Sequence, residues 1–403
     1  MRTGVSGFQP ERLIQARESL GITRVALAAL VGVSPATISN WEKGSQSPEE
    51  DKLRALGDAV KFPVNWFLTS SPEHGNRPYF YRSLASSTKT AREMARVRLN
   101  WVAEISGLLG QWVNLPKVNV PHISEEAFLK ITDSEIETLA YECRRAWGLG
   151  MGPIPDVVLA LENAGIVFSR SEIGYLKMDG VSHWSSLDNR PYVFVAADKA
   201  NGIRNRFDAS HELAHLVLHR NVDEQAFRKH YKLIERQADL FAGCFLLPAE
   251  SFSSEISWPT LETLLSLKQR WKVSVAAMIM RCYQLEIIDD DQKLRLFKGR
   301  SARGWTKGEP YDDYFPFENP RLLNRAVRML VDQNIVDRSE LSYKLGLPEY
   351  LIESLCGLPK GFFSTELNEG NLVELKERSG RRRDKPGSGK GGDVVEFPAR
   401  KFE

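Results

Sequence analysis

Two histidines and a glutamate near the middle of the chain have the spacing of a metal site. The segment FDASHELAHLVLH, residues 207–219, contains His211, Glu212 and His215 in an HExxH pattern. Residues four apart in a helix lie one turn apart on the same face, so both imidazoles can reach a single Zn²⁺. Glu212 would then face the open side of the metal and act as a general base on a water molecule. The pattern predicts a zinc-dependent hydrolytic site.

A carboxylate further along the chain is expected to complete the ligand set. The helical segment ERQADLFAGCFLLP begins at Glu235, twenty residues after His215. Two histidines and a glutamate form a known type of catalytic zinc site, which leaves one position open for water or substrate. Asp239 lies one turn after Glu235 and is expected to accept a hydrogen bond from a ring N–H of His211. This spacing resembles that of gluzincin metallopeptidases.

Other side chains nearby are weaker candidates. His219 continues the face of His211 and His215, but it lies another turn along the axis, which favours a packing or capping role. Glu224 follows the helix closely, and His230 with Tyr231 could be either transition-state hydrogen-bonding groups or surface residues. A helix with buried histidines and no metal is the alternative for the whole site, but a charged glutamate among them would need partners.

A second motif lies near the N-terminus, in ITRVALAALVGVSPATISNWEKG at residues 22–44. Thr23 can cap a first helix, Gly32 permits a tight turn, and Ser34 with Pro35 can begin a second helix. The inner face of the first helix is expected to consist of Val25, Leu27, Ala28 and Leu30. This arrangement predicts a helix-turn-helix.

Small and polar side chains on the second helix suit the major groove of DNA. Ile38 and Trp41 are expected to face the core, which leaves the other positions outward. Asn can contact adenine, Thr can offer a hydroxyl or a methyl group, and Ala can pack on a thymine methyl. The candidate DNA-binding residues are Arg24, Ser34, Ala36, Thr37, Ser39, Asn40 and Lys43.

Residues 10–68 resemble the Xre/Cro-type helix-turn-helix family. The resemblance rests on the Gly-Val-Ser turn, the Thr-Ile-Ser triplet and the ending Trp41-Glu42-Lys43-Gly44. It implies binding to a double-stranded DNA operator, and a homodimer, because such readers usually meet paired half-sites. Arg24 stands where the family often has Gln, and it could hold a phosphate or reach a guanine.

Residues 135–310 resemble the ImmA/IrrE family of zinc metallopeptidases. RNRFDASHELAHLVLH followed by ERQADLFAGCFLLP carries the resemblance, and Ala214 stands where the family often has Gly. It implies Zn²⁺ as cofactor, ligated by His211, His215 and Glu235. In gluzincins a substrate strand lies antiparallel to an edge strand; residues 191–195 are either that edge strand or a paired core strand.

The combination of the two resemblances implies a transcriptional regulator with a zinc-dependent endopeptidase domain. Its substrate would be a partner repressor, encoded nearby, or the chain itself, at a stress, mobile-element or toxin–antitoxin locus. A toxin is a further candidate partner. The alternative is a non-proteolytic repressor or antitoxin whose zinc domain senses a ligand or a partner protein.

The helices and strands that must position these groups can be predicted from the pattern of apolar and turn residues. This pattern indicates a multidomain chain. An all-α helix-turn-helix domain at 1–69 is followed by a linker and long helix at 70–133, with the linker at 70–83 and the helix at 84–115. An α+β zincin-like, gluzincin-type metallopeptidase domain is expected at 134–310, with strands at 165–170 and 190–198. A helical subdomain at 311–375 and a disordered basic tail at 376–403 complete the chain.

Composition agrees with a globular protein. The chain has 403 residues, of which 42% are hydrophobic and 26% charged, with a formal net charge of +2. These values exclude collagenous, wholly disordered and supercharged classes, and the length indicates several domains. The sequence contains neither a secretory signal nor a long apolar run, which predicts a cytoplasmic protein without a membrane partner. The four cysteines are expected to be isolated, partly buried thiols.

Overall fold

The structure is a computed structural model that describes residues 4–75, 77–82, 87–123, 127–175, 178–198 and 201–364. The predicted basic tail at 376–403 lies outside these residues, as does residue 84, where the long helix was expected to begin. Residues up to 365 form one compact unit.

Short helices make up the N-terminal region, as the sequence predicts. They are α1 (Pro10–Ser19), α2 (Arg24–Val31), α3 (Pro35–Glu42), α4 (Glu50–Val60) and the 3-10 helix η1 (Val64–Leu68). Thr23 and Ser34 cap α2 and α3 by accepting hydrogen bonds from backbone N–H groups. Gly32 has a φ of 69°, which glycine adopts without the steric cost of a side chain. The predicted caps and turn are confirmed.

The inner face of α2 differs from the prediction. Leu27 and Ala28 are buried, but Val25 is 64% exposed and Leu30 is 61% exposed. Val31 provides the third buried apolar side chain. Positions 27, 28 and 31 share one face at helical spacing, whereas 25 and 30 lie off that face. Two apolar residues of this helix are therefore at the surface.

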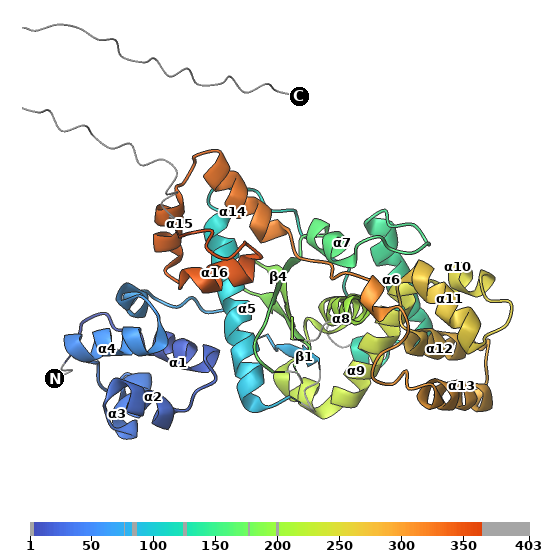
Figure 1. Ribbon diagram of the computed structural model, residues 1–403, viewed down its shortest axis with the longest axis horizontal. Coiled ribbons are helices and arrows are strands. Elements are labelled where there is room, and N and C mark those ends of the chain that lie inside the picture. The colour runs from blue at the N-terminus through green and yellow to red at the C-terminus, as the bar shows by residue number, and fades with distance from the viewer. Residues whose placement is uncertain are drawn as a thin grey trace, which may run out of the picture. The chain divides into compact units, whose positions relative to one another are not determined.

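A mixed sheet of four strands lies at the centre of the described residues (Figure 1). The strands are β1 (Phe80–Arg82), β2 (Val167–Ser171), β3 (Gly180–Ser185) and β4 (Arg190–Ala196), in the order β1-β3-β4-β2. β2 runs parallel to β4, and β3 runs antiparallel to both β1 and β4. The strands predicted at 165–170 and 190–198 correspond to β2 and β4.

The structure decides between the two alternatives for residues 191–195 and corrects the expectation for residues 70–83. β4 pairs with β3 on one side and β2 on the other, so residues 191–195 form a core strand and not an edge strand. Residues 70–83 are not only a linker, because β1 lies within them. β1 pairs with β3, and the sequence predicted neither of these two strands. Local composition misses both, since the partners of a strand lie far along the chain.

Helices cover both faces of this sheet (Figure 1). α5 (Lys89–Leu109) packs on one face, and α8 (Gly202–Ala214), with α9 (Glu224–Leu246) beside it, packs on the other. Alternate residues of β4 follow this division: Tyr192 and Phe194 join the hydrophobic cluster of α5, and Val193 and Val195 join that of α8. α5 is shorter than the predicted 84–115 span.

The remaining elements surround this framework. They are η2 (Ala127–Leu129), α6 (Asp133–Ala146), α7 (Val157–Asn163), η3 (His215–His219), α10 (Ala249–Ser254), α11 (Leu261–Trp271), α12 (Val275–Gln284), α13 (Asp290–Ala302), η4 (Asp312–Tyr314), α14 (Leu322–Asp332), α15 (Arg338–Leu345) and α16 (Glu349–Cys356). All four cysteines are free and buried. Within the described part of the chain, no helix combines the length and apolarity needed to cross a membrane.

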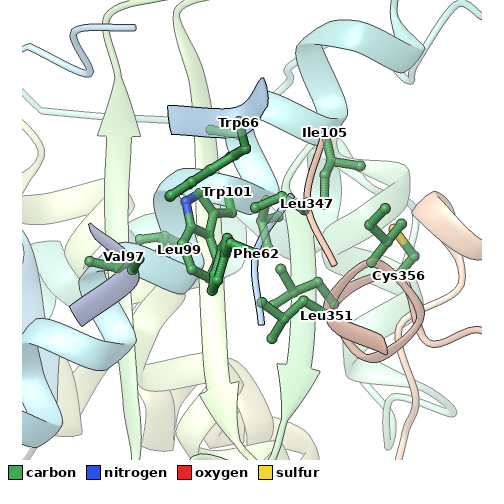
Figure 2. Close-up of a cluster of buried hydrophobic side chains, with 14 of the residues drawn as sticks. Phe62, Trp66, Val97, Leu99, Trp101, Ile105, Leu347, Leu351 and Cys356 are labelled. Atoms are coloured by element: carbon green, nitrogen blue, oxygen red, sulfur yellow. The ribbon is translucent and has the colours of Figure 1, made fainter. Parts of the chain in front are cut away.

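One hydrophobic cluster joins the first helices, α5 and the C-terminal helices. Figure 2 shows Phe62 and Trp66 beside Trp101 of α5, and their ring centroids lie 5.6 and 5.9 Å from that of Trp101. Leu347 and Leu351 of the C-terminal region belong to the same cluster. The fold is therefore a multidomain α+β arrangement in which a helical N-terminal region shares buried contacts with the rest.

Candidate functional site

The HExxH segment forms the end of α8 and the turn that follows it. Asn201 caps α8 by accepting a hydrogen bond from the N–H of Arg204, and the helix continues from His215 into η3, a single π-helical turn. π turns within helices occur often at functional sites. His211, Glu212 and His215 are at most 1% exposed. α8 and the first residue of η3 thus hold three polar side chains inside the protein.

Glu235 of α9 faces the two histidines. Its carboxylate oxygens lie 3.7 Å from His211 Nε2 and 3.6 Å from His215 Nε2. The two Nε2 atoms are 3.1 Å apart. One ligand atom from each of the three residues lies within 4.8 Å of the others, so the structure brings together the residues that the spacing singled out.

Asp239 orients the first histidine. Its Oδ1 lies 2.8 Å from Nδ1 of His211. Burial alone would raise the pKa of Asp239, but the hydrogen bond and charge of His211 outweigh it and hold this pKa below its usual range. A carboxylate accepts, so the ring N–H of His211 is on Nδ1 and the lone pair of Nε2 points toward Glu235.

A longer chain of hydrogen bonds orients the second histidine. The backbone carbonyl of Phe128 accepts from Nε2 of Gln237 at 2.7 Å, so the amide oxygen of Gln237 faces His219, whose Nε2 is 3.0 Å away. Nδ1 of His219 lies 3.1 Å from Nδ1 of His215. His219 therefore donates to Gln237 from Nε2 and accepts from His215 at Nδ1. Burial lowers the pKa of His219 to about 4, which agrees with a neutral ring.

These two chains of hydrogen bonds leave unprotonated ring nitrogens close to a carboxylate, an arrangement that suits a metal ion. Nε2 of His215, like Nε2 of His211, carries no proton, and both face the carboxylate of Glu235. Two lone pairs and an anionic group at such short range repel one another unless a cation lies between them. One carboxylate oxygen of Glu235 is buried and makes no hydrogen bond. The donor set fits a divalent metal that prefers nitrogen and oxygen ligands.

Glu212 lies beside this donor set with both oxygens buried; the hydroxyl of Ser182 acts on this carboxylate and lowers its pKa, but no described residue makes a hydrogen bond of normal geometry with it. Burial raises its pKa to about 7, against the opposing charge of His211. A methyl group at Gly180 of β3 would lie 3.1 Å from Oε1 of Glu212, so the strand approaches this carboxylate closely. A buried carboxylate with free lone pairs can accept a proton from a small molecule such as water.

The weaker candidates take other positions. Glu224 is exposed and forms an ion pair with Arg228, and the ring of His230 packs near Phe128, 6.0 Å between centroids. Tyr231 forms a hydrogen bond with Glu235 and so helps to hold it. Gln237 is a residue of the site that sequence reasoning missed; its only signal was its place between Glu235 and Asp239 in the same helix.

The candidate DNA-binding residues lie on and around α3. Exposed side chains are those of Arg24, Ser34, Ala36 and Lys43, and half-buried ones are those of Thr37, Ser39 and Asn40. Ser34 already caps α3, so its hydroxyl is partly engaged. Arg24 forms an ion pair with Glu42, although its side chain is still 54% exposed. The side chains at the surface of α3 are small or polar, which suits contact with the major groove of DNA.

Comparison with known proteins agrees with both parts of this description. Residues 13–67 match a family described as helix-turn-helix, and residues 161–283 match one described as IrrE N-terminal-like domain. The chain is also 33% identical over 72 residues to repressor protein C2 of Salmonella phage P22. That similarity covers 18% of this chain and 33% of the repressor, so it spans about a third of the repressor's length.

The fold and the comparisons together show a DNA-binding helix-turn-helix and a metallopeptidase-like region in one chain. The chain combines an Xre-type helix-turn-helix domain at 13–67 with a Peptidase M78 domain, of the IrrE/ImmA type, at 161–283. Both family resemblances seen in the sequence are thereby confirmed.

Proposed function

We propose that this protein is a DNA-binding transcriptional regulator with a zinc-dependent endopeptidase activity. It cleaves a partner repressor, or its own chain, and so controls a stress, mobile-element or toxin–antitoxin locus. The observation that carries this proposal is the set of buried His211 and His215 with half-buried Glu235, and the buried carboxylate of Glu212 beside it. The proposed domains are those expected from the sequence, 1–69 for DNA and 134–310 for hydrolysis.

His211, His215 and Glu235 would hold the Zn²⁺. When bound, the metal supplies Lewis-acid chemistry, which polarises a peptide carbonyl and favours attack by water. Glu212 accepts the proton of that water and returns it to the amine that leaves, so one peptide bond and one water molecule become a carboxylic acid and an amine. Asp239 and His219 keep the rings in the tautomers that leave Nε2 unprotonated.

Two substitutions test the proposal on the full chain. Glu235→Ala removes a ligand, so we expect stoichiometric zinc in the wild type and its loss in this variant, measured by elemental analysis. Glu212→Gln keeps shape and metal but removes the base, so we expect full zinc content and loss of cleavage by at least 10²-fold. Cleavage is followed by mass spectrometry of the chain itself and of co-expressed repressors encoded beside it.

Glu224→Gln is the matched control, because it makes the same change at an exposed position of α9. It should retain both zinc and cleavage. Zinc without any cleavage in the wild type would contradict the enzyme proposal. That outcome favours the alternative of a non-proteolytic repressor or antitoxin whose zinc domain senses a ligand or a partner protein.

A further inference from the structure

The short strand β1, from the segment between η1 and α5, lies at the edge of the sheet, next to the candidate metal ligands His211, His215 and Glu235. β1 pairs antiparallel with β3, with Phe80 opposite Ser182 and Arg82 opposite Gly180. β4 covers the other side of β3, so β1 occupies the one side of β3 that another strand could use. An extended peptide that adds to β3 would take the place of β1. The peptide and β1 therefore cannot pair with β3 at the same time.

Phe80 lies directly over a candidate metal ligand. Its ring stacks on that of His215 with 4.8 Å between centroids and 9° between planes. The ring of Phe227 meets the ring of Phe80 edge-on, with 5.2 Å between centroids, and Phe80 is 2% exposed. Val222 and Ile234 belong to the same hydrophobic cluster. Phe227, Val222 and Ile234 thus form an apolar pocket, which Phe80 fills, beside the candidate metal ligands.

Arg82, two residues later, points to the same side of the strand and meets acidic groups. It forms an ion pair with Asp208 of α8, and its guanidinium lies 5.2 Å from the centroid of the Phe207 ring. Asp179, Glu212 and Asp239 are the other carboxylates whose charges act on it. Residues i and i+2 of a strand share a face, so one extended segment fills both pockets.

Arg82 also borders a cavity. With Phe207 and Asp239 it lines a space of about 450 Å³ among the described residues, which extends to Met280 and Trp305. The walls of this cavity are apolar and carry charged side chains of both signs. The pocket of Arg82 therefore adjoins a space in which further residues of a bound peptide would find both apolar and charged contacts.

We propose that β1 holds the place of the substrate, and that the site binds extended peptides with an aromatic residue followed two positions later by arginine. The proposal rests on the proposed function in that the bound peptide is the one to be cleaved. β1 must leave β3 before such a peptide enters. Residues 79–82 are thus an intramolecular competitor, and weakening their hold should expose the site.

The experiment measures binding without cleavage, in zinc-loaded full-length protein carrying Glu212→Gln. The probe is the fluorescein-labelled peptide RPYFYR, the sequence of residues 77–82, followed by fluorescence anisotropy. Arg82→Ala removes the ion pair of β1 with Asp208, while the probe still supplies its own arginine. We expect this variant to bind the probe about tenfold more tightly, because the apparent affinity rises with the open fraction.

Two controls isolate the effect. Arg204→Ala removes another arginine from the same acidic cluster, one that belongs to α8, so probe affinity should stay near that of the parent. A probe with alanine at the positions of Phe80 and Arg82 should lose its affinity for the Arg82→Ala variant. In that variant, amide hydrogen exchange at residues 180–185 should rise when β1 is released and fall again with the probe.

Equal probe affinity in the parent and the Arg82→Ala variant, with the latter folded by circular dichroism, would overturn the proposal. Binding that leaves exchange at 180–185 unchanged would overturn it as well. If Arg82→Ala does not fold, Phe80→Ala serves as the second displacing variant, with the same expectation. A protein that binds the probe after displacement but never cleaves a peptide would support this inference while the proposed peptidase function fails.

Discussion

The tautomers of the two candidate ligand histidines, His211 and His215, follow from hydrogen bonds that end at groups able only to accept, a carboxylate and a backbone carbonyl. Asp239 accepts from His211, and the backbone carbonyl of Phe128 sets the orientation of Gln237, then of His219 and then of His215. Each ring is thus held with an unprotonated nitrogen toward Glu235. Such outer contacts commonly change metal affinity by about 10- to 100-fold.

Gln237→Leu tests this chain at the residue scale. The leucine has a similar size but offers no acceptor to the buried N–H of His219, so His219 and His215 lose their preferred tautomers. We expect zinc affinity to fall about 10- to 100-fold while His211 keeps its partner. The measurement is competition with a chromophoric zinc chelator.

The control for Gln237→Leu is the same substitution at Gln333, an exposed residue directly after α14. It should leave zinc affinity unchanged. If Gln237→Leu also binds zinc like the wild type, the hydrogen-bond chain does not set the state of His215.

At the scale of elements, one buried glutamate connects the first three helices. Glu42 is the last residue of α3 and its side chain is 2% exposed. It forms ion pairs with Arg17 of α1 and with Arg24 at the start of α2. Arg17 is only 13% exposed, so loss of the Glu42 charge leaves a guanidinium that water reaches poorly, with only the longer contact to Glu18 at 3.6 Å.

Glu42→Gln should therefore loosen the helix-turn-helix. We expect the local free energy of unfolding of α1 to α3 to fall by about 2 kcal/mol, less than for a fully buried pair because Arg24 remains half-exposed. Native-state amide hydrogen exchange measures this locally. Glu50→Gln, which breaks an exposed pair with Arg54, should change it by less than about 0.5 kcal/mol. Equal effects of the two substitutions would refute the connecting role of Glu42.

At the scale of the whole molecule, the helix-turn-helix is packed on the helix that supports the sheet. Trp101 of α5 contacts Phe62 and Trp66, and its indole N–H donates to Gln15 of α1 at 3.0 Å. Arg12 of α1 forms an ion pair with Glu104 of α5 at 2.8 Å. These contacts link the DNA-binding region to the element whose far side faces the sheet.

Trp101→Ala should weaken both regions together. Removing a buried tryptophan costs about 3–5 kcal/mol, and here the cavity opens between η1, α1 and α5. We expect faster hydrogen exchange in α1 and η1 as well as in α5, and a lower denaturant midpoint. Trp258→Ala, at a residue 69% exposed, is the control and should change neither. Loss of protection confined to α5 would show that the N-terminal helices are stable without this contact.

The sequence by itself determined the features that depend on neighbours within a few residues. His211 and His215 share a face because a helix brings positions four apart together, and Thr23, Gly32 and Ser34 shape the turn through their own side chains and φ angles. Glu235 was singled out by its spacing after His215 and by the family resemblance, whereas its approach to the two histidines is a contact between helices. The α+β class and both family resemblances could be predicted because they rest on local patterns.

Tertiary structure alone decided which strands pair and which side chains meet across elements. Phe80 reaches β3 and His215 from a segment whose composition is typical of a linker, and β4 lies inside the sheet because β2 and β3 flank it. The exposure of Val25 and Leu30 and the contact of Gln237 with His219 likewise depend on packing between helices. These contacts join residues far apart in the chain, and local propensity carries no information about such partners.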